Sequence, residues 1–329
     1  MNTAFRTVAV ALAAVAVSAC GDAPEDTTAM AEKPAALPAP ADPLFEDVAE
    51  AVNINFEHFA GVSGRYYFPE IMGSGVALAD FDGDGDLDVY AVQGRMIDRE
   101  QPAGEAVLPF PDGQPEGARL FLNQLESGSL TFVDATDGSG LNAGLESHGY
   151  DMGTAVGDVD GDGDNDLLVT SFGPNRLYLN DGAGRFEQAS SRSGIGGEAW
   201  STSAAFLDYD RDGDLDLFVT NYVTFGVANN KQCVGSGGAP DYCDPLSYAA
   251  AADRLFRNDS ADGAVRFTDV TTESGVAAAF GSGLGVTSAD FNDDGWPDVY
   301  VANDKRANQL WINQGDGTFV ENALMSGAA

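Results

Sequence analysis

The 329-residue sequence has little positive charge: 16 lysines and arginines stand against 52 aspartates and glutamates, which gives a formal net charge of −36. This shortage argues against a nucleic-acid partner, because phosphates require basic side chains, and against electrostatic attraction to anionic lipid. Histidine is also scarce, with only His58 and His148, so candidates for a catalytic acid or base are few. With 44% apolar and 10% aromatic residues, the chain can nevertheless form a globular core.

The N-terminus lacks an apolar run long enough to span a bilayer comfortably. Its run VAVALAAVAV, Val8–Val17, follows Arg6 and has the length of the apolar region of an export signal. The run ends in VSAC, which resembles a bacterial lipobox, where cleavage precedes a cysteine that is then lipidated. We therefore expect residues 1–20 to be a signal peptide and Cys20 to be lipidated. An ordinary signal peptide with an incidental cysteine is the alternative.

Residues 21–42 are rich in Ala, Pro, Glu and Thr, so we expect a disordered tether before a folded part at 43–329. The expected location is the outer membrane, surface or periplasm of a bacterial cell, with the membrane reached only through the lipid. In such an oxidising compartment Cys233 and Cys243, ten residues apart, favour a local disulfide. Two free thiols are the alternative, and a zinc site is less favoured because no histidine is near in sequence.

One aspartate-rich nonapeptide occurs four times between short apolar stretches. The copies are DFDGDGDLD (Asp80–Asp88), DVDGDGDND (Asp158–Asp166), DYDRDGDLD (Asp208–Asp216) and DFNDDGWPD (Asp290–Asp298). Crowded carboxylates repel one another and are costly beside a buried strand unless a partner neutralises them. A merely solvated acidic face would not repeat residue by residue.

Comparison of the four copies predicts a calcium loop. Positions 1, 5 and 9 are always Asp, position 3 is Asp or Asn292, and position 6 is always Gly, which suits a sharp turn. Position 7 is Trp296 in the last copy, so this position is expected to offer its backbone carbonyl. Oxygens from positions 1, 3, 5, 7 and 9 suit Ca²⁺, whereas Mg²⁺ demands strict octahedral geometry and is less favoured.

The flanking sequences exclude the EF-hand, which needs a glutamate at position 12 and a helix on each side. Position 12 is Ala91, Val169, Val219 or Val301. The residues around each loop, such as GVALAD before the first and LDVYAV at its end, are short and apolar with no helical period. Each loop is therefore expected to connect two strands.

Two further strands are predicted in each repeat. The third reads RLFLN, RLYLN, RLFRN or QLWIN, and the fourth begins at Phe132, Phe186, Phe267 or Phe319. Four short strands per repeat match the blade of a β-propeller. A calcium-binding β-helix would need tandem nonapeptides, which are absent. An immunoglobulin-like sandwich remains possible, but it does not explain the fourfold self-similarity.

The segments NDGAGRF (Asn180–Phe186) and NQGDGTF (Asn313–Phe319) follow the third strands of two repeats, and FEDVAEAVNINFEHFAG (Phe45–Gly61) precedes them all. Together with the loops, these segments resemble the FG-GAP and VCBS repeats of integrin-α-type propellers. In particular they resemble the cartilage acidic protein 1-like family, whose members usually carry a further C-terminal domain of ASPIC/UnbV type. The resemblance covers residues 45–329 and implies an all-β propeller of four-stranded blades with up to four Ca²⁺ sites.

The resemblance implies that positions 1, 3, 5 and 9 bind calcium through side chains and position 7 through its carbonyl. The side-chain ligands would be Asp80, Asp82, Asp84, Asp88, Asp158, Asp160, Asp162, Asp166, Asp208, Asp210, Asp212, Asp216, Asp290, Asn292, Asp294 and Asp298. The carbonyl ligands would be Asp86, Asp164, Asp214 and Trp296.

The Phe-led strand recurs at residues 45, 132, 186, 267 and 319, so two long repeats alternate with two short ones. The excess at 95–117 and 225–252 is expected to form surface insertions. Phe45–Val48 is expected to be a spare fourth strand, which would give five fourth strands for four loops. We therefore expect four repeats of a seven-bladed parent that is truncated at its C-terminus. A four-bladed ring with a redundant strand is the alternative.

The expected function is a non-enzymatic, calcium-stabilised binding or adhesion scaffold, because loops on a rigid propeller are where partners bind. The partner would be an unidentified protein or glycan at the cell surface. The alternative is a calcium-stabilised propeller enzyme acting on polysaccharide or another extracellular substrate, and a structural role in the envelope is a third possibility. His148, in ESHGYDMG, is expected to be a surface or turn residue. A funnel where His148, Tyr150 and an arginine converge would favour the enzyme.

Overall fold

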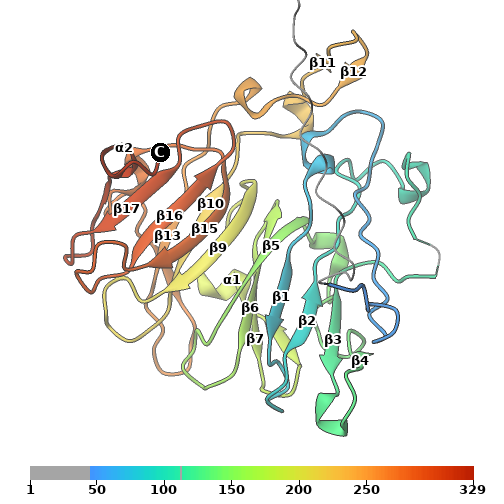
Figure 1. Cartoon of the computed structure of the whole chain (residues 1–329), viewed down its shortest axis with the longest axis horizontal. Coiled ribbons are helices and arrows are strands. Elements are labelled where there is room, and N and C mark those ends of the chain that lie inside the picture. Colours follow the sequence, from blue (N-terminus) through green and yellow to red (C-terminus); the bar gives the residue numbers. More distant parts are fainter. Residues whose placement is uncertain (1–44, 112) are drawn as a thin grey trace, which may run out of the picture. The chain divides into compact units, whose positions relative to one another are not determined.

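The computed structural model describes residues 45–111 and 113–329. The predicted signal peptide, the lipidation at Cys20 and the tether at 21–42 lie outside the described residues. Asp47–Ala329 form one compact unit, which consists mainly of β-strands (Figure 1). None of the helices in this described part has the length and apolar character needed to cross a membrane.

The unit contains four four-stranded antiparallel sheets, one for each repeat. The first sheet orders β1 (Val76–Ala79), β2 (Asp88–Ala91), β3 (Arg119–Asn123) and β4 (Phe132–Asp134). The second orders β5 (Tyr150–Gly157), β6 (Asp166–Phe172), β7 (Arg176–Asn180) and β8 (Phe186–Gln188). The third orders β9 (Ser201–Leu207), β10 (Asp216–Asn221), β13 (Arg254–Asn258) and β14 (Phe267–Asp269). The fourth orders β15 (Gly283–Ala289), β16 (Asp298–Asn303), β17 (Gln309–Asn313) and β18 (Phe319–Glu321).

The remaining elements are short. The hairpin of β11 (Cys233–Val234) and β12 (Pro240–Asp241) lies in the second long insertion. The α-helices are α1 (Ser190–Ser193) and α2 (Ala323–Ser326). The 3₁₀ turns are η1 (Phe68–Ile71), η2 (Ala103–Glu105), η3 (Leu125–Ser127), η4 (Leu145–Ser147), η5 (Val227–Asn229), η6 (Pro245–Ser247) and η7 (Val276–Ala278). The predicted all-β class and the predicted four-stranded repeats are thus confirmed.

The first strands of successive sheets lie side by side, β1 next to β5, β5 next to β9 and β9 next to β15 (Figure 1). Residues from all four of these strands, including Val76, Thr154, Ser203 and Leu284, line one cavity of about 360 Å³. Each sheet then continues outward through its second, third and fourth strands. An innermost first strand and an outermost fourth strand make the arrangement propeller-like.

The core lies between neighbouring sheets, because the middle strands are apolar on both faces. Leu167 and Leu168 are adjacent in β6 and point to opposite faces of the sheet. Leu167 packs with Tyr90 of the first sheet, and Leu168 packs with Leu217 of the third. Both leucines are fully buried. Burying each such side chain contributes about 1.5–3 kcal/mol.

In the second, third and fourth sheets, an asparagine at the end of the third strand ties the sheet to the loop of the preceding one. Asn180 Nδ2 donates to Phe81 O at 2.9 Å, and Asn258 Nδ2 donates in the same way to Val159 O at 2.9 Å. In the fourth sheet, Asn313 Nδ2 donates to Tyr209 O at 2.8 Å. The asparagine that ends the third-strand motif therefore makes a contact between sheets in these three repeats.

The two long insertions were expected on the surface, and most of their residues are exposed or half-buried, but a few of their large side chains are buried. Ile97 from the first insertion and Phe225 and Tyr248 from the second are buried in one cluster with Trp200 and Tyr222. The reason is that Trp200, just before β9, and Tyr222, just after β10, are large aromatic side chains that require an apolar cover. In the second insertion, Cys233 and Cys243 form a disulfide, and Cys243 belongs to the same buried cluster.

The strand predicted at Phe45–Val48 is absent, and Phe45 is 92% exposed. Its sequence imitates the fourth strand of a repeat, but a strand also needs an edge to pair with. The chain makes its first contact with the first sheet further on, where Val52 O accepts a hydrogen bond from Phe132 N at 2.8 Å. Val52 packs there with Phe121 and Phe132.

Candidate metal sites and an arginine-lined cavity

Each aspartate nonapeptide joins the first strand of a sheet to the second, as predicted. The first aspartate closes the loop: Asp80 Oδ1 accepts from Gly83 N at 2.8 Å, and Oδ2 accepts from Gly85 N at 2.9 Å. Gly85, at position 6, has φ of +92°, a conformation that glycine adopts without the penalty of a side chain. The equivalent glycine in the next loop, Gly163, has φ of +98°.

The last aspartate of each loop is buried and holds three segments together. Asp88 Oδ2 accepts from Phe81 N at 2.7 Å, and Oδ1 accepts from Asn123 N at 2.8 Å. Asp166, Asp216 and Asp298 repeat this pair of contacts. Burial raises the pKa of Asp88 to about 6 and that of Asp166 and Asp216 to about 7. Sequence reasoning identified these residues as ligands but missed this role in the fold.

In three loops, the carboxylates of positions 1, 3 and 9 converge, with oxygen atoms within 4.8 Å of one another. The groups are Asp80, Asp82 and Asp88; Asp158, Asp160 and Asp166; and Asp208, Asp210 and Asp216. Burial, followed by the charge of the aspartate at position 5, raises the pKa of Asp82, Asp160 and Asp210. The position 5 and 7 aspartates are outside these three groups.

In the first and fourth loops, the side chain at position 7 contacts residues outside the loop. In the first loop, the carboxylates of Asp84 and Asp86 meet that of Glu126, which lies after β3. Asp86 Oδ2 also accepts from Glu126 N at 2.9 Å. In the fourth loop, the Trp296 ring packs against Gly315 and lies 4.7 Å below the guanidinium of Arg211. Sequence reasoning missed Glu126, because only the fold brings this residue to the loop.

The fourth loop differs from the others. Asn292 occupies position 3, and its Nδ2 donates to Asp294 Oδ2 at 2.8 Å. Its Oδ1 accepts from Asp294 N at 2.9 Å. Among the described residues, the groups of three converging carboxylates are found in the first three loops and do not include this one.

Three carboxylate oxygens in these loops are buried and have no hydrogen-bond partner among the described residues: Asp82 Oδ1, Asp160 Oδ1 and Asp208 Oδ1. A buried anionic oxygen without a partner is costly. Each lies in a different group of converging carboxylates. The donor set therefore fits a hard cation that prefers oxygen ligands.

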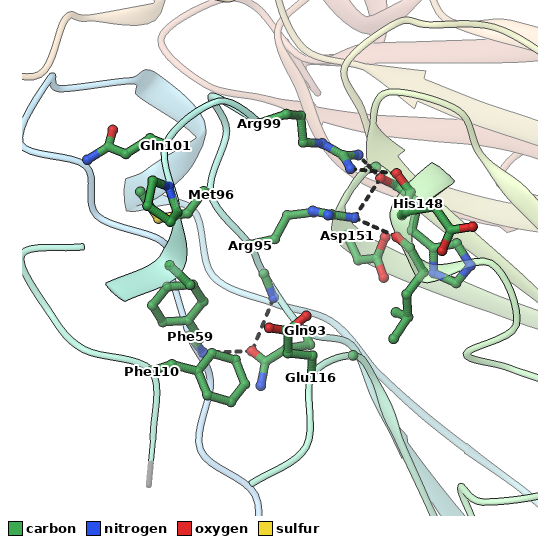
Figure 2. A pocket seen from close by; sticks show the side chains of 17 residues that line it. Phe59, Gln93, Arg95, Met96, Arg99, Gln101, Phe110, Glu116, His148 and Asp151 are labelled. Atoms are coloured by element: carbon green, nitrogen blue, oxygen red, sulfur yellow. Dashed lines mark hydrogen bonds between the residues drawn. The ribbon is translucent and has the colours of Figure 1, made fainter. Parts of the chain in front are cut away.

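A second site lies at the other end of the first two sheets, where β2 has ended and β5 begins. It is a cavity of about 390 Å³. Phe59, Met96 and Phe110 form one wall, and Arg95, Arg99, His148 and Asp151 lie across from them (Figure 2). The rings of Phe59 and Phe110 are 4.9 Å apart.

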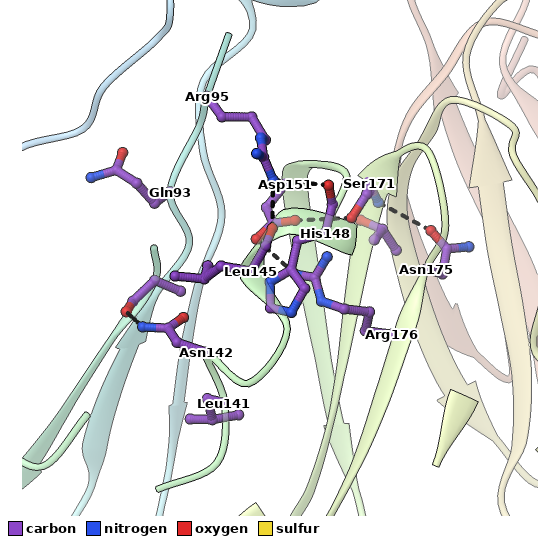
Figure 3. A network of polar contacts seen from close by, with 12 residues as sticks. Gln93, Arg95, Leu141, Asn142, Leu145, His148, Asp151, Ser171, Asn175 and Arg176 are labelled. Atoms are coloured by element: carbon purple, nitrogen blue, oxygen red, sulfur yellow. Dashed lines mark hydrogen bonds and ion pairs between the residues drawn. The ribbon is translucent and has the colours of Figure 1, made fainter. Parts of the chain in front are cut away.

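Behind the cavity, Asp151 is part of a buried polar network (Figure 3). Arg176 Nη2 donates to Asp151 Oδ2 at 2.7 Å, and Ser171 Oγ donates to Oδ1 at 3.0 Å. Asn175 Oδ1 accepts from Ser171 N at 3.0 Å, which extends the network toward the third sheet. Both oxygens of Asp151 are therefore engaged, and Arg176 neutralises its charge.

His148 was expected on the surface or in a turn, but it lies in this cavity and is 3% exposed. Its Nε2 is 3.0 Å from Ala143 O, so this nitrogen donates. Burial, together with the charge of Arg176, lowers the pKa of His148 to about 4. The imidazole is therefore neutral near pH 7. Tyr150 donates to Ala60 O at 3.2 Å.

Comparison with known proteins identifies the repeats. Residues 158–219 and 290–328 match the model of the FG-GAP-like repeat, and these stretches contain the second, third and fourth aspartate loops. The chain contains FG-GAP-like repeats. The FG-GAP part of the predicted resemblance is thus confirmed, and none of the curated proteins matches the chain significantly.

Two solved structures illustrate what the chain is similar to. One is an Agrocybe aegerita lectin that recognises non-reducing terminal N-acetylglucosamine, with 19% identity and a TM-score of 0.38 over 74% of this chain and 49% of the lectin. The other is rhamnogalacturonan lyase YesW, with 17% identity and a TM-score of 0.30 over 75% of this chain and 46% of the lyase. The chain thus spans about half the length of the structures it matches.

Proposed function

We propose that this chain is a calcium-stabilised, propeller-like scaffold that binds a protein or glycan outside a bacterial cell, to which it is attached through a lipid at Cys20. The resemblance to cartilage acidic protein 1-like proteins is part of this proposal. The observation that carries it is the convergence of carboxylates at positions 1, 3 and 9, with buried oxygens that have no partner in three loops.

The aspartates at positions 1, 3, 5 and 9, together with Asn292 in the fourth loop, would hold calcium with side-chain oxygens, and position 7 would add its carbonyl. Bound calcium would supply positive charge that offsets the repulsion between the carboxylates. The same aspartates accept hydrogen bonds from the loop and from the third strand. Calcium that stabilises these aspartates would therefore fasten the loop between the first two strands of a sheet to the third strand.

A binding role is favoured over catalysis by the chemistry of the cavity. The arrangement does bring His148 together with arginines, which is the feature expected of an enzyme. With its pKa lowered to about 4, however, His148 is a weak base at neutral pH. Asp151 is engaged by Arg176 and Ser171, and the other lining carboxylates, Glu116 and Glu146, are exposed to solvent. The described lining residues include no Ser, Cys or Lys that could act as a nucleophile.

Unfolding with calcium and with a chelator tests the proposal. A site that binds only the folded state adds about 2.7 kcal/mol at a calcium concentration a hundred times Kd. We expect calcium to raise the unfolding midpoint more than magnesium at equal concentration. Asp160→Asn should reduce the calcium-dependent shift, while Asp137→Asn, at an exposed position outside the loops, should leave it unchanged. A wild-type midpoint that is the same with calcium and chelator would refute the proposal.

A further inference from the structure

The cavity of about 390 Å³ brings two arginine side chains together in a chain that has few basic residues. Of the 16 lysines and arginines in the sequence, Arg95 and Arg99 line this cavity, and Arg176 lies directly behind it. The carboxylate nearest to Arg176 is Asp151, which it neutralises at 2.7 Å. The cavity therefore offers two guanidinium groups, those of Arg95 and Arg99, that are not paired with Asp151.

Arg95 and Arg99 form no ion pair with a carboxylate among the described residues; they donate to backbone carbonyls of one segment. Arg95 Nη1 donates to Leu145 O at 2.7 Å and to His148 O at 3.1 Å. Arg99 Nη1 donates to Glu146 O at 2.8 Å, and its Nη2 donates to His148 O. Each guanidinium has five N–H donors, so donors remain available on both side chains.

The electrostatics of the cavity favour an anion. Burial and then the charge of Arg99 lower the pKa of Arg95, so the two guanidinium groups repel each other. Glu116 and Glu146 also line the cavity, but both are exposed to solvent, where water and salt weaken their effect. An anion between the arginines would relieve their repulsion and accept their remaining N–H groups.

The cavity is also held in shape before any ligand arrives. Gly61 and Gly94 let the N-terminal segment pass close to the Arg95 backbone: a Cβ on Gly61 would lie 2.2 Å from Arg95 O, and one on Gly94 would lie 2.3 Å from Phe59 O. Phe59 is 4% exposed, and its N–H donates to Gln93 Oε1 at 2.6 Å. A preformed site of this kind loses little conformational entropy on binding.

We propose that this cavity binds a small organic carboxylate, whose anionic group lies against Arg95 and Arg99 and whose body packs on Phe59 and Phe110 (Figure 2). Planar guanidinium groups match a carboxylate geometrically. The aromatic wall suits a ring, either an aromatic one or the apolar face of a sugar acid. A volume of about 390 Å³ is at the small end of ligand pockets.

This inference goes beyond the calcium-stabilised scaffold and does not depend on it. The cavity includes Gly149 and Asp151 around the start of β5, whereas the second aspartate loop follows its end at Gly157. Six residues of β5, 152–157, separate Asp151 from the loop by about 20 Å. Calcium titration and ligand titration of the full chain therefore report on different ends of the molecule.

Isothermal titration calorimetry in a calcium-containing buffer tests the proposal with matched probes. The pairs are D-glucuronate with D-glucose and benzoate with benzyl alcohol. Inorganic phosphate serves as an anion that has no ring to pack on the aromatic wall. We expect at least one carboxylate to bind at least about tenfold more tightly than its neutral partner. Binding of phosphate alone, equal binding of neutral partners, or no binding of either carboxylate at millimolar concentration would overturn the proposal.

Variants locate the site. Arg95→Gln and Arg99→Gln should each weaken carboxylate binding at least about tenfold, because each removes charged hydrogen-bond donors. Arg266→Gln, which removes the same charge from an exposed position just before β14, should not change the affinity. If Arg95→Gln fails to fold, the exposed Arg99 still decides the question. Unchanged affinity in folded Arg99→Gln would mean that the arginines only hold the 145–148 segment.

Discussion

Asp253→Asn is expected to stabilise the protein at pH 8. Asp253 directly precedes β13 and is 1% exposed. Its Oδ1 accepts from Asn221 N at 2.9 Å, while Oδ2 has no partner among the described residues. The equivalent residues before β7 and β17 are Asn175 and Asn308. In each of these, Oδ1 accepts from the end of the second strand and Nδ2 donates to another group.

The size of the effect follows from the cost of burying the charge. Burial raises the pKa of Asp253 to about 7, from an ordinary value of 3.8. Because the folded-state pKa is raised, the contribution of this carboxyl to stability is fully present below about pH 4 and is lost as the pH rises to about 7. At about 1.36 kcal/mol per pH unit, the difference is about 4 kcal/mol as an upper bound. Asparagine keeps the acceptor and never becomes charged.

Urea unfolding of wild type and variant at several pH values between 4.5 and 8.5, with calcium constant, measures this difference. The gain in unfolding free energy should grow with pH and level off above about pH 8, and other titrating groups cancel in the comparison. The reciprocal variant Asn175→Asp should lose stability with rising pH, because it introduces a buried carboxyl at the matching position. A pH-independent difference, or a less stable Asp253→Asn at pH 8, would refute the reasoning.

Three further outcomes are expected. Asn258→Ala should destabilise the protein by about 2–4 kcal/mol in urea unfolding, because it removes the bonds to Val159 O and Leu215 O and leaves buried carbonyls without a donor. The fourth loop should bind calcium most weakly, because Asn292 replaces a charged ligand there, and Asn292→Asp should tighten it. Calorimetry on single-loop variants that found this site to be the tightest would contradict this expectation. Cys20→Ser should leave the protein soluble or unprocessed, whereas a wild type found wholly in the soluble fraction would contradict the lipid anchor.

The repeating parts of the fold could be predicted from the sequence because the same pattern of residues occurs in four copies, and each copy supports the interpretation of the others. Third strands at Arg119–Asn123 and Gln309–Asn313 begin and end where the motif does. The cavity could not be predicted in the same way. Its lining comes from three segments that are distant in sequence and contain Phe59, Arg95 and His148. No local sequence pattern indicates that these segments meet. Such contacts depend on how the insertions pack, which varies from repeat to repeat.

Single unrepeated segments also misled the sequence prediction. The sequence of Phe45–Val48 is similar to that of a fourth strand, but this segment is not paired with the edge of a sheet. The second insertion is rich in Gly and polar residues, yet Phe225 and Tyr248 within it cover Trp200. Composition averages over a segment, whereas burial is decided by the few large side chains that face an apolar surface.

An aspartate that recurs in all four loops can be required for either of two reasons: it binds a cation, or it accepts backbone hydrogen bonds with both of its oxygens. The structure distinguishes these two reasons. Both oxygens of Asp88 accept backbone N–H groups, so asparagine, with a single acceptor, would fail there even without a metal. The same holds for Asp80. At position 3 of the first loop, Asp82 does not accept hydrogen bonds with both oxygens, because its Oδ1 has no partner among the described residues. The unpartnered oxygens of Asp82, Asp160 and Asp208 therefore support a cation, whereas the fully engaged oxygens of Asp88 do not.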